Sequence, residues 1–580
     1  MDAYWEFRSR NEKRLENERD RRFAPAQHGL ALVIPSPYPQ GMSGLGALWV
    51  YERVNATPGW SCERLFAPDP PWLSRPWRAW PHPAICTLET RTPLSEFSLI
   101  GVSLSAEVEV ITLLKMLRAA GIEPLRRDRT EGPLILVGGP LALVASGVVG
   151  AVADLVFLGD SEESLPRFLA LAGEGRGDPA SVAAAGIDGV WVPGCEPASL
   201  SGGLPAPPSF VEPPSPLGSC RRSPPPMHSQ SAGGPHRRHP AGSSAPSSPD
   251  LCCADSWPTD AGRECVLPAG SFGPAVSHLI TPEGEFGEKV LVEVSRGCSR
   301  ACAFCMMSRH ARPCGMRLFP KDAILAALRG EGKALSDRSD LSDLSDVSDV
   351  SDQSDQSDQS DQSDQSDVSD RSDSPAAYPA SVGLVGAAVS DHPALVEIVE
   401  TLAAAGTKVS LSSVRADRAS PELLTALVAG GLRTLTLGLD GASERLRTLI
   451  DKQCSVDDFL TACENAAACG LNAIKVYCIL GYPDETDADV EELADLLLRV
   501  PRSLQVRLSL SALTPKPGTP LHDAPLPHEK KLLARVRLLK KRLGHVKIQA
   551  PSVKEAAFEH AVDHGDAEWL TELLDKIDRE

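Results

Sequence analysis

The sequence predicts an α/β protein with two successive parallel sheets. A doubly wound sheet is expected over residues 28–195, and a partial barrel of six strand–helix units, a (β/α)6 arrangement, over residues 285–520. Short apolar runs alternate with segments whose apolar residues recur at helical spacing, and glycines stand where the apolar runs end. Two stretches without such spacing, residues 196–280 and 336–373, are expected to be long disordered insertions.

The first sheet is predicted from short apolar runs that end in glycine. Helical apolar spacing over residues 108–120 follows one of these runs. Strand, helix and strand in this order, with Gly138 and Gly159 at strand ends, are typical of a doubly wound, Rossmann-like sheet. Ahead of it, residues 1–27 are expected to form a charged helix. The strands are expected at residues 31–35, 98–103, 134–137 and 154–158.

The barrel is predicted from six repeats of strand and helix, because such units build parallel barrels. Strands are expected at residues 290–294, 382–385, 408–412, 434–438, 474–480 and 505–510. Helices are expected at residues 321–328, 394–404, 421–429, 443–449, 456–468 and 490–498. Residues 521–580 are expected to form a helical extension, with one short strand at 546–550.

The two insertions decide how the charge of the chain is interpreted. Residues 196–280 are rich in proline, serine, glycine and arginine, which favours a disordered linker. Residues 336–373 repeat Ser-Asp-X and hold thirteen aspartates against two arginines, so they contribute much of the net charge of −19. Net charge therefore excludes no partner class, and nothing in the composition indicates nucleic acid.

The compartment is inferred from the N-terminus and the cysteines. Residues 1–22 are dense in charge and have no apolar core, so no secretory signal is expected. The longest apolar stretch, residues 134–159, is interrupted by Pro140, several glycines and Asp154, which disfavours a membrane span. Fifteen cysteines in such a chain indicate thiols or metal ligands in a reducing compartment. We expect a soluble cytoplasmic protein.

Three cysteines follow the first predicted barrel strand. Cys298, Cys302 and Cys305 have the spacing C-x3-C-x2-C, with Phe304 just before the last one. Three thiolates in one loop can hold three irons of a [4Fe–4S] cubane, and the fourth iron is then open to a substrate. Arg296 and nearby Arg300 could stabilise the anionic cluster and its thiolates.

The same cysteines also permit two simpler interpretations. Cys314 could be a fourth ligand, which would close a zinc or electron-transfer site. The three cysteines could also be close by chance. Their spacing, the aromatic residue and the preceding strand together favour the cluster. The isolated cysteines are expected to be packed thiols, among them Cys62, Cys86, Cys195, Cys454, Cys463, Cys469 and Cys478.

At these residues the chain resembles the radical S-adenosylmethionine (radical SAM) superfamily, whose signature is a C-x3-C-x-aromatic-C loop at the end of the first barrel strand. The resemblance covers about residues 285–520. It implies that Cys298, Cys302 and Cys305 are catalytic and ligate a [4Fe–4S] cluster whose open iron binds SAM. An electron from flavodoxin or ferredoxin then cleaves SAM, and the 5′-deoxyadenosyl radical takes hydrogen from a substrate.

Later segments resemble the SAM-binding strand ends of that superfamily. The segment 383–388 lacks the glutamate of the Gly-Gly-Glu version, and Asp440 stands where relatives usually carry glutamate. For Asp440 and Arg415, ordinary surface ion pairing is an equal alternative. The residues for which the resemblance implies contact with the cofactor are Phe304, Gly386, Ala387, Ser412, Ser413, Arg415, Asp440 and Gly481.

The N-terminal region resembles the cobalamin-binding-like domain that precedes the barrel in one radical SAM branch. Cobalamin binders in that branch usually carry Asp-x-His-x-x-Gly after the first strand, whereas residues 37–41 are Pro-Tyr-Pro-Gln-Gly. We therefore expect the fold without bound cobalamin. Residues 513–520 resemble the end of the barrel in the same branch, where Lys516 could meet an anionic substrate or be a solvated loop charge.

The expected function is a radical SAM enzyme of unidentified substrate. Methyl or methylthio transfer and radical rearrangement or cross-linking are both open, although transfer would need cobalamin or a second cluster. A different class is a non-catalytic iron–sulfur or zinc protein that acts as a binding module. The basic helix at 529–543 could touch RNA but is interpreted as a solvated face; its charges are Lys530, Lys531, Arg535, Arg537, Lys540, Lys541 and Arg542.

Overall fold

The computed structural model describes residues 3–195, 265–266, 272–307, 316–330 and 378–580. All of the described residues belong to one compact unit. The Ser-Asp repeat and most of the expected linker lie outside the described residues. Within the described residues, every helix is too short or too polar to cross a membrane.

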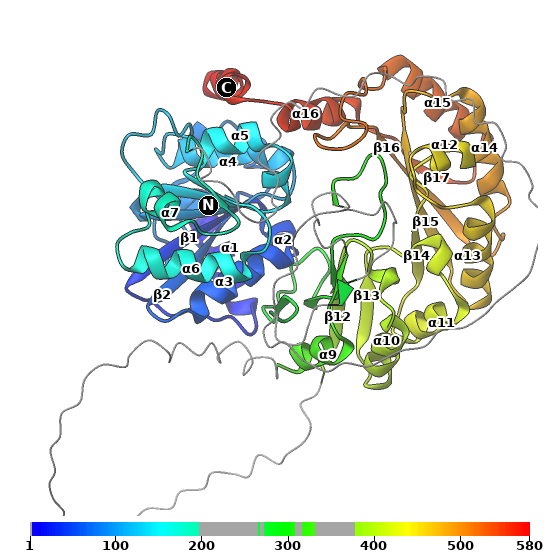
Figure 1. The fold of residues 1–580 in the computed structure, drawn as a ribbon, viewed down its shortest axis with the longest axis horizontal. Coiled ribbons are helices and arrows are strands. Elements are labelled where there is room, and N and C mark those ends of the chain that lie inside the picture. Colours follow the sequence, from blue (N-terminus) through cyan, green and yellow to red (C-terminus); the bar gives the residue numbers. More distant parts are fainter. Residues whose placement is uncertain (1–2, 196–264, 267–271, 308–315, 331–377) are drawn as a thin grey trace, which may run out of the picture. The chain divides into compact units, whose positions relative to one another are not determined.

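The N-terminal region forms the predicted doubly wound sheet (Figure 1). The strand order is β2-β1-β3-β4-β5-β6, and all neighbours are parallel except β5 and β6. The strands are β1 (His28–Pro37), β2 (Trp60–Ala67), β3 (Leu99–Ser103), β4 (Leu134–Gly138), β5 (Leu155–Phe157) and β6 (Val190–Trp191). Parallel strands buried on both faces explain their continuous apolar runs.

Helices cover both faces of this sheet. One hydrophobic core includes α4 and α5, and the other includes α3 and α6. The helices are α1 (Ala3–Asn17), α2 (Tyr38–Gly41), α3 (Leu45–Ala56), α4 (Val108–Ala119), α5 (Ser146–Val152), α6 (Ser161–Gly173) and α7 (Pro179–Ala185). The charged helix expected over residues 1–27 is therefore α1, which ends at Asn17.

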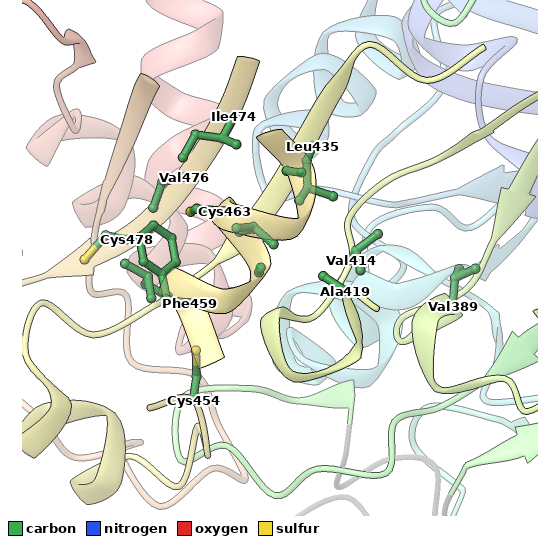
Figure 2. Close-up of a cluster of buried hydrophobic side chains, with 14 of the residues drawn as sticks. Val389, Val414, Ala419, Leu435, Cys454, Phe459, Cys463, Ile474, Val476 and Cys478 are labelled. Atoms are coloured by element: carbon green, nitrogen blue, oxygen red, sulfur yellow. The ribbon is translucent and has the colours of Figure 1, made fainter. Parts of the chain in front are cut away.

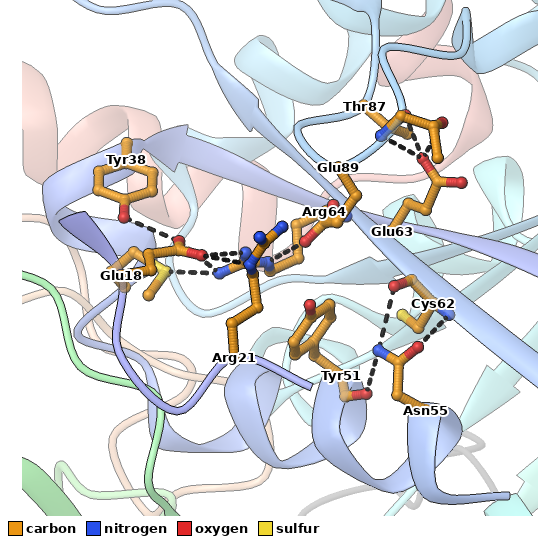
Figure 3. Close-up of polar contacts among 12 residues, drawn as sticks. Glu18, Arg21, Tyr38, Tyr51, Asn55, Cys62, Glu63, Arg64, Thr87 and Glu89 are labelled. Carbon is orange, nitrogen blue, oxygen red and sulfur yellow. Dashed lines mark hydrogen bonds and ion pairs between the residues drawn. The ribbon is translucent and has the colours of Figure 1, made fainter. Parts of the chain in front are cut away.

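Strand β2 was not predicted, although all of its residues are buried. Its charged residues find partners inside the domain. Arg64 is fully buried between Glu18 and Glu89, at 2.8 and 2.7 Å (Figure 3). Charged side chains interrupt the alternation by which a strand is recognised, so β2 had no period to detect.

The barrel contains the six predicted parallel strands, in chain order (Figure 1). A parallel bridge between Val414 and Leu437 joins β13 to β14. A further short strand, β17 (Lys547–Gln549), pairs parallel with β16. The six strands are β9 (Val290–Glu293), β12 (Ser381–Val385), β13 (Lys408–Leu411), β14 (Thr434–Gly438), β15 (Ala473–Leu480) and β16 (Gln505–Ala512).

Helices pack on one side of these strands around one large core. They are α9 (Lys321–Arg329), α10 (Leu395–Ala404), α11 (Pro421–Ala429), α12 (Glu444–Leu449), α13 (Val456–Ala468) and α14 (Asp487–Leu498). The extension contains α15 (Glu529–Arg542), α16 (Val553–Asp563) and α17 (Ala567–Arg579). The apolar face of α17, with Leu570 and Leu574, is buried in the core of the N-terminal sheet.

The expected linker ends earlier than predicted. Within residues 272–280, strand β8 (Val276–Ser277) pairs antiparallel with β9. The carboxylate of Glu52 accepts hydrogen bonds from Ser277 Oγ (2.9 Å) and His278 N (3.1 Å). A strand of two residues is too short for a detectable period, which is why the boundary at residue 280 was wrong.

Candidate active site

The three cysteines of the motif lie in the loop after β9, at the carboxyl edge of the parallel strands. The chain leaves β9, forms β10 (Ser295–Arg296) and turns at Gly297, whose φ is 81°. Cys302 is buried, and Cys298 and Cys305 are half-buried. The carboxyl edge is where parallel barrels place their active sites.

The three thiols are near enough to interact electrostatically. The pKa of Cys302 is raised to about 12, mainly by burial. Lys452 acts to lower this pKa, whereas Cys305 and Cys298 act to raise it. Burial also raises the pKa of Cys298. Cys305 acts to raise this pKa too, and Lys452 acts to lower it. An electron-poor metal or a cationic neighbour is what such buried thiols need to become thiolates.

A single metal ion and a cubane place different demands on the geometry of their ligands. Among the residues that the structure describes, no group of three or more His, Cys, Asp or Glu side chains could hold one metal ion. In a cubane each cysteine binds a different iron, so its three sulfur atoms need not converge on one point. Cys314, the candidate fourth ligand of a closed zinc site, lies outside the described residues.

Asp440 and Lys452 form an ion pair beside the cysteines. Asp440 follows β14 with a φ of 57°, and its carbonyl accepts a hydrogen bond of 2.8 Å from Tyr482 Oη. Under this turn the buried Arg447 donates to the carbonyls of Gly441 (3.1 Å) and Cys454 (2.7 Å). The sequence motif indicated Asp440 but not Lys452. Lys452 contacts Asp440 only because the loop after α12 returns to the cysteine loop.

Asp391 links the cysteine loop to the third strand end. Its carboxylate is buried and accepts from Ser299 Oγ (2.6 Å) and from Arg415 Nη1 (2.7 and 2.9 Å). Arg415 also pairs with Asp417, to which Arg300 Nη2 donates at 2.9 Å. Arg415 is thus paired with two carboxylates in the structure. Sequence reasoning missed Asp391, because an aspartate after a strand-end turn has no distinguishing signal.

The remaining predicted cofactor residues lie at the same carboxyl edge, Phe304 in the cysteine loop and the others in the segments that follow β12, β13 and β15. A Cβ on Gly386 would lie 2.5 Å from Ser295 Oγ in β10, which leads into the cysteine loop. The segment after β12 can therefore approach β10 this closely only with glycine at position 386. Gly481 has a φ of 101° and donates to Glu485 at 2.7 Å. Ser412 and Ala387 are exposed, whereas Ser413 and Phe304 are half-buried.

Comparison with known proteins identifies the family of the chain. The family model described as "Radical SAM proteins, N-terminal" matches residues 46–193, and the model "Radical SAM superfamily" matches residues 375–497. The chain is a radical SAM protein. The second match begins near the end of the Ser-Asp repeat, so the three cysteines lie outside the matched residues.

One curated relative is an uncharacterized protein of Methanocaldococcus jannaschii. It is 28% identical over 262 residues, which are 45% of this chain and 48% of the relative. The radical SAM protein thus spans about half the length of this relative.

Solved structures resemble the chain only distantly. The cobalamin-dependent SAM radical enzyme OxsB with aqua-cobalamin and SAM bound is 11% identical, with a TM-score of 0.41, over 90% of this chain and 58% of OxsB. Methylornithine synthase is 13% identical, with a TM-score of 0.27, over 48% and 69% of the two chains. Coproporphyrinogen III oxidase from Escherichia coli is 17% identical, with a TM-score of 0.23, over 28% and 40%.

Two charges of the radical SAM protein have other partners than the sequence suggested. Lys516 is neither solvated nor open to substrate, because its ammonium group pairs with Asp563 at 2.7 Å and with Glu107. Arg535 does not belong to a solvated face of α15, because its buried guanidinium pairs with Glu485. Both contacts join segments distant in sequence, which spacing along the chain does not show.

The other cysteines of the described residues are mostly packed thiols, as predicted. Cys454, Cys463 and Cys478 lie among the apolar side chains of the barrel core (Figure 2). Burial raises the pKa of Cys463 to about 12 and that of Cys454 to about 11. Thiols protonated in this way act as small apolar groups rather than as ligands.

The side chain of Glu109 lies where the strand order of the N-terminal sheet reverses. Doubly wound sheets bind ligands where the strand order reverses, here between β1 and β3. The carboxylate of Glu109 occupies this position and accepts from Ser36 Oγ and Ser105 N, both at 2.6 Å. Tyr38, within the segment that replaces the cobalamin motif, is buried and hydrogen-bonds to Glu18 at 2.9 Å. The segment 37–41 thus offers no histidine that could ligate cobalt.

Proposed function

We propose that this chain is a radical SAM enzyme that holds a [4Fe–4S] cluster on Cys298, Cys302 and Cys305. The observation that carries the proposal is that one loop, which follows β9 at the carboxyl edge of a parallel barrel, holds all three thiols at buried or half-buried positions. When bound, such a cluster supplies the electron that cleaves SAM to a 5′-deoxyadenosyl radical, which takes hydrogen from a substrate.

The residues around the cysteines have distinct tasks in this proposal. Lys452 stabilises the anionic thiolates, since its ammonium group interacts with both Cys302 and Cys298. Asp391 holds the cysteine loop by accepting from Ser299, while it orients Arg415. Glycine at position 386 lets the backbone after β12 come close to the cluster loop, where the amino group of SAM would bind.

Contacts with SAM are proposed for the residues that share the carboxyl edge. They are Phe304, Gly386, Ala387, Ser412, Ser413, Arg415, Asp440 and Gly481. Asp440 is the candidate for the ribose hydroxyls, because its carboxylate is oriented by Lys452 at the end of β14.

We further propose that the reaction does not use cobalamin. Glu109 lies where the strand order of the N-terminal sheet reverses, and no histidine follows β1 in residues 37–41. This favours rearrangement, cross-linking or another hydrogen-abstraction outcome over cobalamin-dependent methyl transfer. A one-electron donor such as flavodoxin or ferredoxin and a cytoplasmic location remain predictions.

The test starts with anaerobic purification and reconstitution of the full chain with iron and sulfide. Iron and sulfide content, electron paramagnetic resonance (EPR) after dithionite and release of 5′-deoxyadenosine from SAM are measured. Cys302→Ser is the test variant. Cys469→Ser is the matched control, because Cys469 is half-buried at the end of α13 and contacts Thr425 at 3.6 Å.

The proposal predicts about four irons per chain and 5′-deoxyadenosine from the parent and from Cys469→Ser, with loss of both in Cys302→Ser. Corrinoid is expected to be absent from all three proteins. Zinc in place of iron, held with the help of Cys314, would support the alternative of a non-catalytic binding module. A cluster that never cleaves SAM in the presence of dithionite would also count against the enzyme.

A further inference from the structure

Two arginines close the loop that carries the three cysteines. Strand β10 pairs antiparallel with β11 (Arg317–Leu318), and in this register Arg296 faces Arg317. Cys298, Cys302 and Cys305 lie in the chain between these two arginines. Guanidinium groups on facing residues repel each other unless an anion lies between them.

Asp160, at the amino end of α6, supplies this anion. Its Oδ1 accepts hydrogen bonds from Arg296 Nη1 (2.7 Å) and Arg317 Nη2 (2.9 Å), and its Oδ2 accepts from Arg317 Nη1. Arg296 has two further carboxylate partners, Glu162 and Glu293. In the part of the chain that the structure describes, Asp160 is the one carboxylate that pairs with Arg317.

The position of Asp160 would ordinarily give its side chain a different partner. It is the N-cap of α6, where an aspartate normally accepts from the first backbone N–H groups of the helix. Asp160 makes no such bond. In the same domain Asp178, the N-cap of α7, does accept from Ser181 N at 3.0 Å. The carboxylate of Asp160 therefore binds the arginines instead of the helix end.

We propose that Asp160 is a positioning residue for the cluster: by joining Arg296 to Arg317 it fixes the two ends of the cysteine loop. The proposal rests on the proposed function, since it assigns the N-terminal sheet a task in the chemistry of the barrel. The N-terminal sheet then contributes through Asp160, in the loop after β5, which holds the cysteine loop of the barrel.

The test compares the full-length parent with Asp160→Asn, which keeps the size and the capping ability of the side chain but removes its charge. Asp178→Asn is the matched control, because it changes an exposed N-cap aspartate of the same domain whose carboxylate bonds to Ser181. Arg317→Gln and the double variant complete a cycle. The readouts are hydrogen exchange of amides 297–307 without cluster, iron release to a chelator, and the midpoint potential of the cluster.

In Asp160→Asn the amides of residues 297–307 are expected to exchange about tenfold faster, because a charge-assisted link at both loop ends is lost. Iron release is expected to accelerate about as much, and the midpoint potential to shift to a more positive value, since a nearby anion disfavours the more negative reduced cluster. Arg317→Gln should reproduce the faster amide exchange and iron release, and the double variant should add little to either. Its midpoint potential should instead shift to a more negative value, because this variant removes a cation near the cluster.

The exchange measurement needs no cluster, so it separates this proposal from the proposed function. Faster loop exchange in Asp160→Asn alone supports the positioning role even if the parent binds no iron. Equal exchange, iron release and potential in Asp160→Asn and Asp178→Asn would overturn it. Full additivity of Asp160→Asn and Arg317→Gln would overturn it too, because residues that act through one contact are not additive.

Discussion

Lys452 pairs with Asp440 at the point where the turn after β14 meets the cysteine loop. Both side chains are largely buried, with exposed fractions of 20% and 17%. The pair puts one cation among three thiols and one carboxylate. Lys452 is therefore a cation that acts directly on the thiols of Cys298 and Cys302.

Replacing Lys452 with methionine is expected to weaken SAM binding about tenfold and to destabilise the fold by about 1–3 kcal/mol, since it leaves a half-buried carboxylate without its cation. Equilibrium SAM binding and urea unfolding measure the two effects. Lys321→Met is the control, because it breaks an exposed pair with Glu397 on α10. Equal behaviour of the two variants would show that the Lys452 pair has no role at the site.

Asp391→Asn tests the link between the cysteine loop and Arg415. The variant keeps the shape of the side chain but loses the charge that pairs with Arg415 and accepts from Ser299. We expect SAM affinity to fall about tenfold and iron to be released faster, since both partners lose a charge-assisted bond. Asp322→Asn, an exposed change in the first turn of α9, should alter neither quantity.

Sequence reasoning found the elements whose signal is local. The parallel strands β9 and β12 appear as apolar runs, because consecutive residues on both of their faces are buried. The cysteine loop was recognisable from spacing within one segment. The carboxyl-edge position of Gly386 and Gly481 followed from their place after strands.

What the sequence did not reveal depends on contacts between distant segments. Lys452 and Asp391 become site residues only when their loops return to the cysteine loop. Lys516 has the sequence context of a loop charge, yet it is bound by Glu107 from a position 409 residues away in sequence. Charged residues are interpreted as exposed unless a partner is known, and the partner is not in the local pattern.

Arg64→Met is expected to be strongly destabilising. The buried guanidinium of Arg64 lies between Glu18 and Glu89, and burial raises the pKa of Glu89 (Figure 3). Removing the cation takes the ion-pair partner from the buried Glu89 and leaves Glu18 with a long contact of 3.8 Å to Arg21. We therefore expect a loss of about 3–5 kcal/mol and release of α1.

Urea unfolding and hydrogen exchange of α1 measure this effect. Arg8→Met is its control, because the pair between Arg8 and Glu12 within α1 is more than one third exposed. It should cost at most about 0.5 kcal/mol. A similar small cost for Arg64→Met would mean that the ion pairs of Arg64 do not hold α1 in place.

Asp563 is expected to make the stability of the fold decrease as the pH rises, which is the opposite of what an ion-paired carboxylate usually does. It lies at the end of α16, where its side chain is fully buried and shares Lys516 with Glu107 and Glu559. Burial raises the pKa of Asp563 to about 7, although Lys516 opposes the rise. The folded chain therefore holds a proton that the unfolded chain releases near pH ~4.

Because the folded state binds the extra proton between about pH 4 and pH 7, stability is expected to fall as the pH rises through this window. Asp563→Asn removes the titrating group, so the free energy of unfolding of the parent relative to this variant should decrease by about 1–3 kcal/mol between pH 5 and pH 8. Urea unfolding at several pH values measures it, with Glu572→Gln on the exposed face of α17 as the control. A parent and an Asp563→Asn variant with parallel pH profiles would mean that the three carboxylates stay ionised around Lys516.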